Sequence, residues 1–230
     1  MADITINVLK PSVNNLTVRI FVRAASLDFE EVDVWGATDT PEFLAKDPAG
    51  LTPLVEEAGL PRGSLWESCA IMQYFCNKHG LNQLYPTAPG ERAMVDSAMF
   101  YHAATLYPLV ARATYPTLGF PQYPGEVGSS DADAEAKAAA QAASAAAIAK
   151  PLDVYRSWFL DGKQFVGGSA PSIADIRLAA TLEFLRAIDY EFPTWADEYT
   201  AATEAALGDA YTEPVQDVRG FIQYALSQNA

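Results

Sequence analysis

Glu67 and Ser68 are residues whose types and position could do chemistry, because they stand where a helix is expected to begin. The stretch ESCAIMQYFCNKHG (67–80) carries apolar residues at helical spacing and ends on Gly80, a residue common just after a helix. The start of a helix has unpaired backbone N–H groups and a dipole that favours an anion. A carboxylate beside such donors suits an amino-acid head group, which carries both charges. The alternative is plain capping of the helix by Ser68.

A second feature is Pro53, in the stretch LTPLVEE (51–57). It interrupts what otherwise reads as a short buried strand, and a proline cannot donate to a sheet ladder. Either the segment is not a central strand, with Pro53 at its edge or start, or the backbone at Thr52–Pro53 has an unusual shape that a function requires.

Two other polar motifs predict structure and not chemistry. Ser172 and Asp175, in the sequence SIAD, fit a capping box in which Asp replaces the usual Glu or Gln. They are interpreted as a folding element. His79 and His102 have no neighbouring Cys or acid pair, so no metal site is predicted.

Composition limits the classes of protein that the chain can represent. It has 230 residues, half of them apolar, and a net charge of −14 with only 15 basic residues. No basic patch predicts a nucleic-acid or anionic-membrane partner, no apolar run is long enough to span a bilayer, and the first residues do not resemble a signal peptide.

Cys69 and Cys76 lie two helical turns apart, about 10 Å of rise, too far for a disulfide. A reducing, cytoplasmic location is expected.

The elements that must position these residues differ between the two halves of the chain. The first 80 residues predict the order β-α-β-α-β-β-α, with strands at 4–9, 28–35 and 53–57, a turn at 60–65 into a fourth strand, and helices at 14–26, 40–47 and 67–80. The rest predicts helices only, at 91–115, 131–159, 171–188, 197–207 and 217–226. We therefore expect an α/β domain over residues 1–80, a linker over 81–90 and an all-helical domain over 91–230.

Four segments, in this order, resemble the cytosolic glutathione transferases: KPSVNNLTVRIFVRAASLDFEEVDV (10–34), FLAKDPAGLTPLVEE (43–57), LWESCAIMQYFCNKHG (65–80) and FVGGSAPSIADIRLAATL (165–182). The similarity is to bacterial members of the serine-type classes theta, zeta and phi. It implies an α/β + all-α fold, with a thioredoxin-like N-terminal domain (βαβαββα) before the all-helical domain. It also implies glutathione as co-substrate, a small hydrophobic electrophile as second substrate, and a homodimer.

The resemblance gives roles to the residues at the expected binding site. It implies that the bond before Pro53 is cis and that Thr52 pairs its N–H and C=O with the cysteinyl backbone of glutathione, like an added strand. It further implies that Ser68 holds the γ-glutamyl carboxylate and that Glu67 contacts the ammonium group.

The resemblance also implies a catalytic donor that holds the cysteine thiol of glutathione as a thiolate, since only the thiolate is the nucleophile. Ser12 is the candidate, because it follows the first strand and lies 18 residues before Glu30 of the Asp-Phe-Glu signature. Asn14 and Asn15 remain alternatives. Asn14 occupies the place where some members have a cysteine, so the thiol-exchange reaction of those members is disfavoured.

The chain departs from the family pattern at the glycine end of the tripeptide. Leu51 stands where many members have Lys or Gln, and no basic residue lies near Thr38. The segment 56–64 is also longer than the usual hairpin. These departures leave the residue that holds the glycine carboxylate undefined.

The electrophile pocket is expected between the loop after the first strand and the long helix that begins the second half. Aromatic and other apolar residues there could line it: Met99, Phe100, Tyr101, Tyr107, Tyr115, Phe120 and Tyr123. One or two of them are expected at the site and the others in the core. A phenol near the sulfur could bond to a leaving group or a developing alkoxide.

The sequence therefore predicts an enzyme that transfers glutathione to an epoxide, a halide or an aryl ether, in detoxification or in the catabolism of aromatic or foreign compounds. The alternative is a non-catalytic carrier or protein-interaction module with the same fold. A thioredoxin-type oxidoreductase is disfavoured because no Cys-x-x-Cys follows the first strand.

Overall fold

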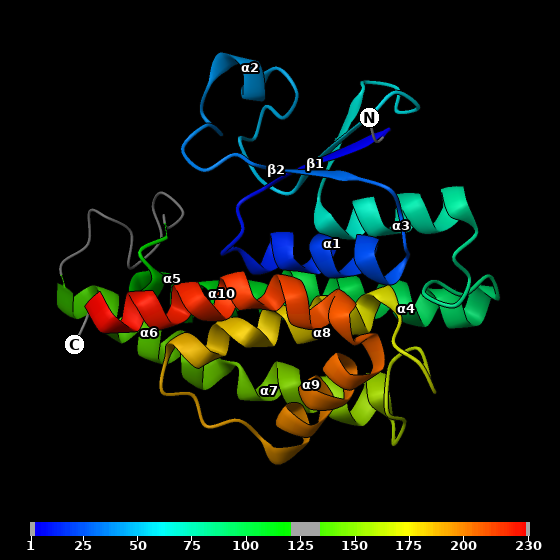
Figure 1. The fold of residues 1–230 in the computed structure, drawn as a ribbon. Helices are drawn as coiled ribbons and strands as arrows, with labels where there is room; N and C mark the ends of the chain where they lie inside the picture. The colour runs from blue at the N-terminus through cyan, green and yellow to red at the C-terminus, as the bar shows by residue number, and fades with distance from the viewer. Residues whose placement is uncertain (1–2, 121–133, 229–230) are drawn as a thin grey trace.

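The computed structural model describes residues 3–120 and 134–228 (Figure 1). Its first part is a four-stranded sheet in the order β2-β1-β3-β4. The strands are β1 (Ile4–Val8), β2 (Glu30–Asp33), β3 (Leu54–Glu57) and β4 (Ser64–Trp66). β1 pairs in parallel with β2 and antiparallel with β3, and β3 pairs antiparallel with β4. The parallel pair needs a crossover, which α1 (Val13–Ala24) supplies.

Helices cover both faces of this sheet (Figure 1). α1 and α3 (Ser68–His79) lie on the face toward the rest of the molecule, and the short α2 (Pro41–Leu44) lies on the other side. The predicted order β-α-β-α-β-β-α is confirmed. α3 ends as its sequence indicates, at Gly80 with φ of 63°, a left-handed conformation that glycine adopts without strain.

From Pro89 onward every regular element is helical in the described residues. These elements are α4 (Pro89–Tyr101), η1 (His102–Leu106), α5 (Tyr107–Leu118), α6 (Ala134–Ala147), α7 (Ala149–Val154), η2 (Tyr155–Leu160), α8 (Ile173–Leu182), η3 (Glu183–Ala187), α9 (Thr194–Leu207) and α10 (Asp209–Gln228). None of the helices in the described ranges combines the length and the apolar character that crossing a bilayer requires.

Two long helices of the prediction are interrupted in the structure. The pattern 91–115 contains a π-helical segment, η1, at residues 102–106. Pro108, two residues after the end of η1, has no N–H for the helical ladder, and a wider turn accommodates the missing hydrogen bond. The first three residues of the predicted helix 131–159 lie outside the described residues, and the rest breaks at Ile148. Pro151 lies in the first turn of the helix that follows. The last helix, predicted over 217–226, is longer in the structure. α10 begins at Asp209 and includes Pro214 in its interior.

α1 is the element that joins the two parts. Its residues from Leu16 to Val22 are all buried, and it packs against α3, α8 and α10. Arg19 is buried within it and ion-pairs with Glu31 of β2 and with Asp217 of α10. The sheet and the helical part thus share one core through α1 (Figure 1).

The predicted capping box at the start of α8 is confirmed. The Asp175 carboxylate is fully buried and accepts hydrogen bonds from the N–H groups of Val166, Gly167 and Ser172 and from the hydroxyls of Ser172 and Tyr199. One carboxylate therefore fixes the start of α8 and the loop before it. Its role is structural.

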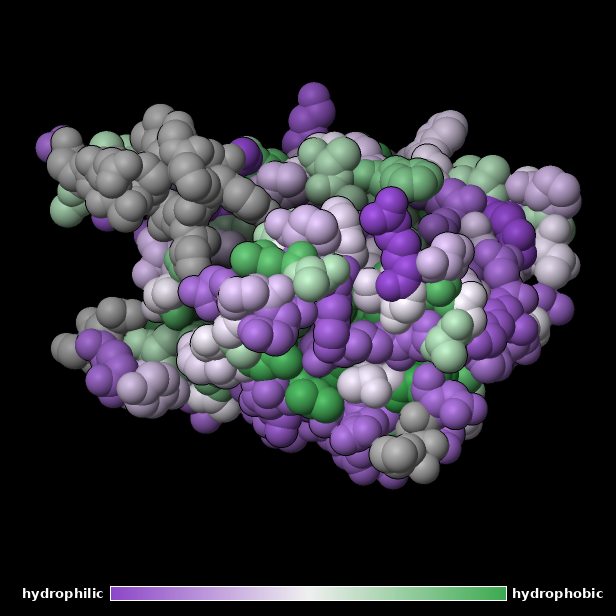
Figure 2. Space-filling model, turned by 90° about the horizontal axis from the view of Figure 1, so that it is seen from above, coloured by the Kyte–Doolittle hydropathy of each residue, from purple (hydrophilic) through white to green (hydrophobic). Residues whose placement is uncertain are grey.

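Seen from above, hydrophilic residues cover much of the surface, and hydrophobic residues lie between them in small groups (Figure 2). This distribution agrees with a net charge of −14 in a chain that is half apolar.

Candidate active site

Ser12 lies in the turn between β1 and α1, as the N-cap residue of α1. Its backbone groups are both bonded, the N–H to the Leu9 carbonyl at 3.0 Å and the C=O to the Leu16 N–H at 2.8 Å. Its hydroxyl makes no capping bond to the helix, and no hydrogen bond of this hydroxyl to another described residue is present. A half-buried hydroxyl is therefore available at a helix N-terminus, where a negative charge is favoured.

The two neighbouring asparagines use their amide groups inside the protein. Asn14 Nδ2 donates to the hydroxyl of Tyr107 at 2.6 Å, and Asn15 Nδ2 donates to Oγ1 of Thr52 at 2.9 Å. Both lie in the first turn of α1 and neither is its N-cap. Their Oδ1 atoms are buried without a partner in the described part of the chain.

The Thr52–Pro53 peptide bond is cis, as the resemblance implies. Pro53 is buried, and Thr52 precedes the first residue of β3. In the described residues, no other backbone group bonds to the N–H or C=O of Thr52. The hydrogen bond from Asn15 places this loop next to the first turn of α1, and hence next to Ser12.

Glu67 and Ser68 occupy the start of α3, where the sequence places them. Glu67 is the N-cap with φ of 74° and ψ of 109°, a backbone conformation that non-glycine residues rarely adopt and that concentrates at functional sites. Its side chain is exposed and does not cap the helix. Ser68 is buried as the first helical residue. The shape of the backbone thus presents the helix start and the carboxylate of Glu67 to solvent or to a ligand.

Leu51 does not replace the missing basic residue. Its side chain is 48% exposed, and its N–H donates to the carboxylate of Asp47 at 2.9 Å. Asp47 also accepts from the N–H of Ala49. This carboxylate fixes the loop before Thr52, and the anchor for the glycine end of a tripeptide stays undefined.

Models of two protein-family domains match the chain. The model of the glutathione S-transferase N-terminal domain matches residues 9–77, and that of the glutathione S-transferase C-terminal domain matches residues 134–204. Together the two models cover more than half of the chain.

The chain belongs to the glutathione S-transferase family.

Solved structures of other glutathione transferases align over nearly the whole chain. The BmGSTD1 enzyme of Bombyx mori is 27% identical with a TM-score of 0.76, over 97% of this chain and 96% of that one. Two others are less similar in sequence and show the shared fold. The theta-class enzyme of Xanthomonas axonopodis pv. citri, solved with glutathione bound, is 24% identical with a TM-score of 0.73 over 94% and 98% of the two chains. Human glutathione-S-transferase T1-1 is 22% identical with a TM-score of 0.78 over 97% and 98%.

The protein is thus an enzyme of the glutathione transferase type with glutathione as co-substrate. The thioredoxin-like sheet followed by helices is the architecture that the resemblance implies.

A row of aromatic rings leads from the first turn of α1 to the surface of the transferase, and we call it the aromatic series. The hydroxyls of Tyr107 and Tyr115 lie 2.6 Å apart. The ring of Tyr115 is 5.4 Å from that of Phe120, Phe120 stacks on Phe221 at 5.4 Å, and Phe221 lies 6.2 Å from Trp35. Trp35 is 60% exposed and ends the series.

The other residues considered for the pocket have different surroundings. Met99 is in the core, Phe100 is 65% exposed, and Tyr101 packs against Tyr155 and Phe159. Tyr123 lies outside the described residues. Sequence reasoning missed Trp35 and Phe221, which come from the loop after β2 and from the last helix. The only sequence feature that could have indicated these two residues is that each is a large aromatic residue in polar surroundings.

Sequence reasoning also missed Arg177, on α8. It is 3% exposed, and its guanidinium lies 5.0 Å from the centre of the Tyr107 ring. His102 stacks near the same ring at 6.2 Å and is fully buried. Burial, and then the charge of Arg177, lower the pKa of His102 well below its usual value, so this histidine is neutral. The sequence feature that could have indicated Arg177 is that it is a single arginine in the apolar run IADIRLAATL.

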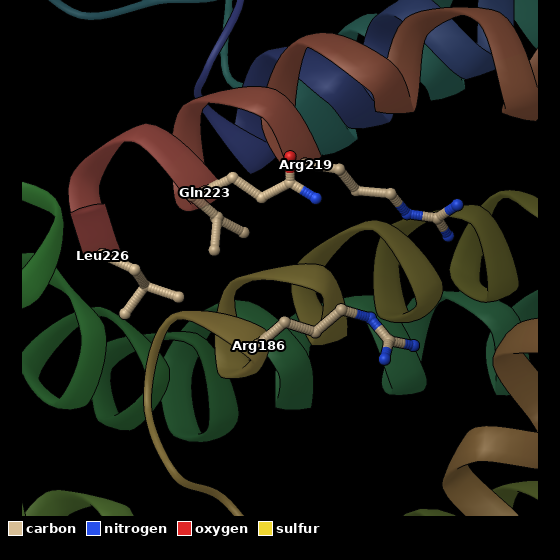
Figure 3. A pocket seen from close by; sticks show the side chains of 5 residues that line it. Arg186, Arg219, Gln223 and Leu226 are labelled. Atoms are coloured by element: carbon tan, nitrogen blue, oxygen red, sulfur yellow. The ribbon is translucent and has the colours of Figure 1, made fainter.

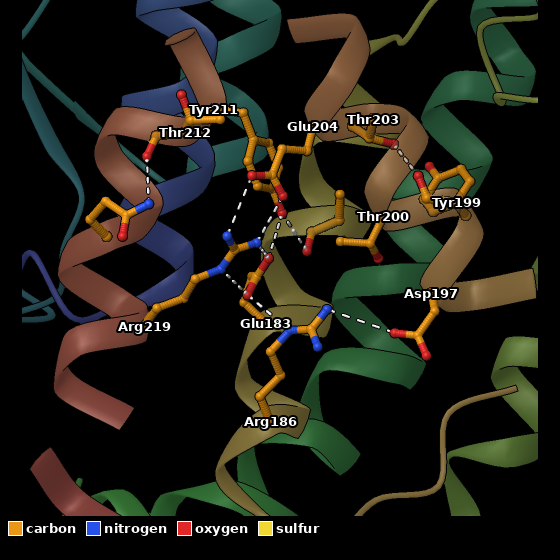
Figure 4. A network of polar contacts seen from close by, with 12 residues as sticks. Glu183, Arg186, Asp197, Tyr199, Thr200, Thr203, Glu204, Tyr211, Thr212 and Arg219 are labelled. Carbon is orange, nitrogen blue, oxygen red and sulfur yellow. Dashed lines mark hydrogen bonds and ion pairs between the residues drawn. The ribbon is translucent and has the colours of Figure 1, made fainter. Parts of the chain in front are cut away.

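A cavity of about 480 Å³ lies elsewhere, between α10 and η3 (Figure 3). Arg186 and Arg219 line it together with Ile222, Gln223 and Leu226, and no residue predicted to bind glutathione does. Both arginines are already ion-paired with Glu183 (Figure 4).

The carboxylate of Glu183 has zero exposure and also accepts from Tyr211, while Arg219 binds Glu204 as well (Figure 4). The cations of this cavity are therefore compensated by acids of the protein. The predicted site residues Ser12, Thr52 and Ser68 do not line this cavity.

Proposed function

We propose that the enzyme ionises the thiol of glutathione with the hydroxyl of Ser12 as hydrogen-bond donor. One observation carries the proposal. The Ser12 hydroxyl is without a described partner at the N-terminus of α1, whereas the amides of Asn14 and Asn15 already donate to Tyr107 and Thr52. A free thiol with a pKa of about 8.5 is mostly protonated at neutral pH, and a donor beside a helix N-terminus stabilises the thiolate.

The tripeptide is proposed to bind along Thr52, Pro53, Glu67 and Ser68. The unbonded N–H and C=O of Thr52 support pairing with the cysteinyl backbone, as in the addition of a strand to a sheet. The N-terminus of α3 supports a carboxylate at Ser68, and the exposed carboxylate of Glu67 supports an ammonium group beside it. Together these groups match both charges of the γ-glutamyl end.

The electrophile is proposed to lie along the aromatic series. The thiolate attacks the electrophilic carbon of an apolar substrate, a C–S bond forms, and the bond from that carbon to oxygen or halide breaks. With an alkyl halide, the halide ion leaves with the electron pair. With an epoxide or an aryl ether, the oxygen gains the charge, and a phenol of Tyr107 or Tyr115 is placed to give it a proton. The stacked rings of Phe120 and Phe221 favour a flat, apolar substrate.

The remaining parts of the function are also proposals. Residues 1–80 form the glutathione-binding domain, 81–90 the linker, and 91–230 the domain that lines the electrophile pocket. The enzyme works in the cytoplasm, in detoxification or in the breakdown of aromatic or foreign compounds. It is a homodimer, and the exposed Phe100 and Met94 on α4 supply apolar surface for a second copy.

The experiment that tests this function has two parts. Ultraviolet absorbance of the thiolate is followed as glutathione is added at neutral pH, and product formation is measured over a panel of epoxides, alkyl halides and aryl ethers. We expect thiolate on binding and turnover of at least one class. Glutathione binding without any thiolate would contradict the proposal and favour a non-catalytic carrier.

A further inference from the structure

We propose that Arg177 is a positioning residue for this reaction, a buried cation whose counter-ion is the bound glutathione. It has no acidic partner in the described protein, and its charge favours the thiolate. The inference rests on the proposed function, because it assumes that glutathione ionises at Ser12.

The first observation is that the charge of Arg177 is buried and not compensated. Its Nη1 donates to Oγ1 of Thr17 at 3.3 Å, and its Nε has no partner within the described residues. No carboxylate of the described ranges forms an ion pair with it. A guanidinium keeps its proton in a protein, so this position holds a full positive charge. Such a charge is costly to bury without a counter-charge.

Two other arginines, the buried Arg19 and the partly exposed Arg219, behave differently. Arg19 is also 3% exposed, but it pairs with Glu31 and Asp217. Arg219 pairs with Glu183 and Glu204. Asp175 is the acid nearest to Arg177 in the sequence, yet its oxygens accept the hydrogen bonds of the capping box. Arg177 therefore departs from the arrangement that the rest of this protein uses.

The second observation is where the charge lies. The guanidinium lies over the ring of Tyr107, whose hydroxyl is 2.6 Å from Asn14 Nδ2 in the first turn of α1. Thr17, which binds the guanidinium, donates to the Val13 carbonyl at 2.8 Å in the same turn. The cation thus lies directly behind the turn that begins at Ser12, and it adds to the positive end of the helix dipole.

The charge of Arg177 also acts on Cys69 of α3. Burial raises the pKa of the Cys69 thiol, and the charge of Arg177 opposes this increase. Cys69 directly follows Ser68, where the γ-glutamyl carboxylate is proposed to bind. The charge of Arg177 therefore acts both beside the first turn of α1, near the proposed thiolate, and on α3, near the proposed carboxylate. Opposite charges interact strongly in a buried site, because water screens them little.

The groups around Arg177 leave this charge available to the ligand. His102 is neutral at neutral pH, the hydroxyl of Tyr155 donates to the Ala98 carbonyl, and burial keeps Cys69 protonated. The acids on the adjoining elements are Asp175, which is held by its cap, and Glu67, which is exposed. Of these groups, none carries a negative charge that pairs with the guanidinium.

The test is a pH titration of the thiolate absorbance in the glutathione complex of the full-length enzyme. Arg177→Met removes the charge, Arg177→Lys retains it, and Arg19→Met removes an equally buried arginine that has partners. We expect the thiolate midpoint to rise by about one pH unit in Arg177→Met, as loss of a nearby opposite charge does. Turnover at neutral pH falls about tenfold and recovers at higher pH, since one pKa unit is a factor of ten. Arg177→Lys keeps a midpoint close to that of the wild type.

The control separates charge from folding. Arg19→Met is expected to lower the melting temperature and leave the thiolate midpoint unchanged. A folded Arg177→Met protein with an unchanged midpoint would overturn the proposal for Arg177 alone. If that variant does not fold, Arg177→Gln, which can keep the hydrogen bond to Thr17, gives the same test. A wild-type enzyme that forms no thiolate would overturn both this inference and the proposed function.

Discussion

Asn15 donates from Nδ2 to Oγ1 of Thr52 at 2.9 Å and so connects the first turn of α1 to the loop before cis-Pro53. The two residues are 37 positions apart, and each lies beside one part of the proposed site. Ser12 is three residues before Asn15, and the backbone of Thr52 is where the tripeptide is proposed to pair. The bond therefore fixes the distance between the proposed thiol donor and the surface proposed to hold the cysteine of glutathione.

Substitution of Asn15 by alanine should weaken glutathione binding. The Thr52 hydroxyl loses its partner, and a lost hydrogen bond of about 1 kcal/mol corresponds to a roughly fivefold rise in KM for glutathione. The catalytic rate at saturation should change less. Steady-state kinetics with varied glutathione measure both constants. Asn14→Ala is the matched control, because it breaks the bond to Tyr107 and leaves Thr52 paired. An unchanged KM in Asn15→Ala would contradict this role.

Substitution of Ser12 by alanine should lower turnover far more than affinity. A hydrogen bond to a charged group contributes about 1.5–3 kcal/mol, so kcat should fall roughly 10- to 100-fold at neutral pH. Glutathione affinity, measured by calorimetry, should stay within a few-fold of the wild type. Ser12→Thr keeps the hydroxyl and should retain part of the activity. If Ser12→Ala retains full turnover, the donor must be Asn14 or Asn15.

Removal of the phenol groups should separate the classes of electrophile. In Tyr107→Phe or Tyr115→Phe the ring stays in the aromatic series while the proton donor is lost. A positioned acid contributes about 100-fold or more, so opening of an epoxide should slow by that order. Displacement of a halide needs no proton and should change by only a few-fold. Equal losses for the two substrates in both variants would show that the hydroxyls act on the structure and not on the leaving group.

The buried carboxylate of Glu57 should make stability depend on pH. Burial alone would raise the pKa of the Glu57 carboxyl, but hydrogen bonds from Lys78 and Tyr74 outweigh it and hold the pKa below its usual value. A carboxyl with a lowered pKa stabilises the fold above the pKa of the unfolded chain, about 4.3, and this stability is lost as the pH falls through the folded value.

Glu57→Gln should therefore lower the free energy of unfolding by about 1 kcal/mol at pH 7 and by progressively less below about pH 4. Urea unfolding at several pH values measures this difference. Glu30→Gln is the control, because Glu30 is exposed and has no ion pair among the described residues. A difference between wild type and Glu57→Gln that persists at low pH would contradict the assignment.

The sequence predicts the order of strands and helices well, because alternation, helical spacing and turn residues are local properties. The capping box of Ser172 and Asp175 is of the same kind, and the structure confirms it. The π-helical segment before Pro108 was not predicted, because helical spacing alone does not show a change of helix type. The helix boundaries differ from the predicted ones near two prolines. Pro151 lies in the first turn of α7, and Pro214 lies inside α10.

The candidate site was only partly predictable, because its contacts are long-range. Glu67, Ser68 and Pro53 are recognised from their own segments. By contrast, the bond from Asn14 to Tyr107 joins residues 93 positions apart, and no local pattern shows it. The position of Arg177 beside Tyr107 likewise depends on how α8 packs against α1 and on the direction of Tyr107 after η1.

The way α1 is enclosed has a consequence for exchanging parts between related enzymes. This helix belongs to the first half of the sequence, yet α8 and α10 of the second half pack against it. Its Arg19 forms ion pairs with one carboxylate in each half. A chimera cut at the linker would separate matched surfaces and leave a buried guanidinium beside a foreign helix. An exchange of the first half between related enzymes should therefore also transfer the residues of α8 and α10 that contact α1. The part to be exchanged is then defined by these contacts and not by a continuous segment of the sequence.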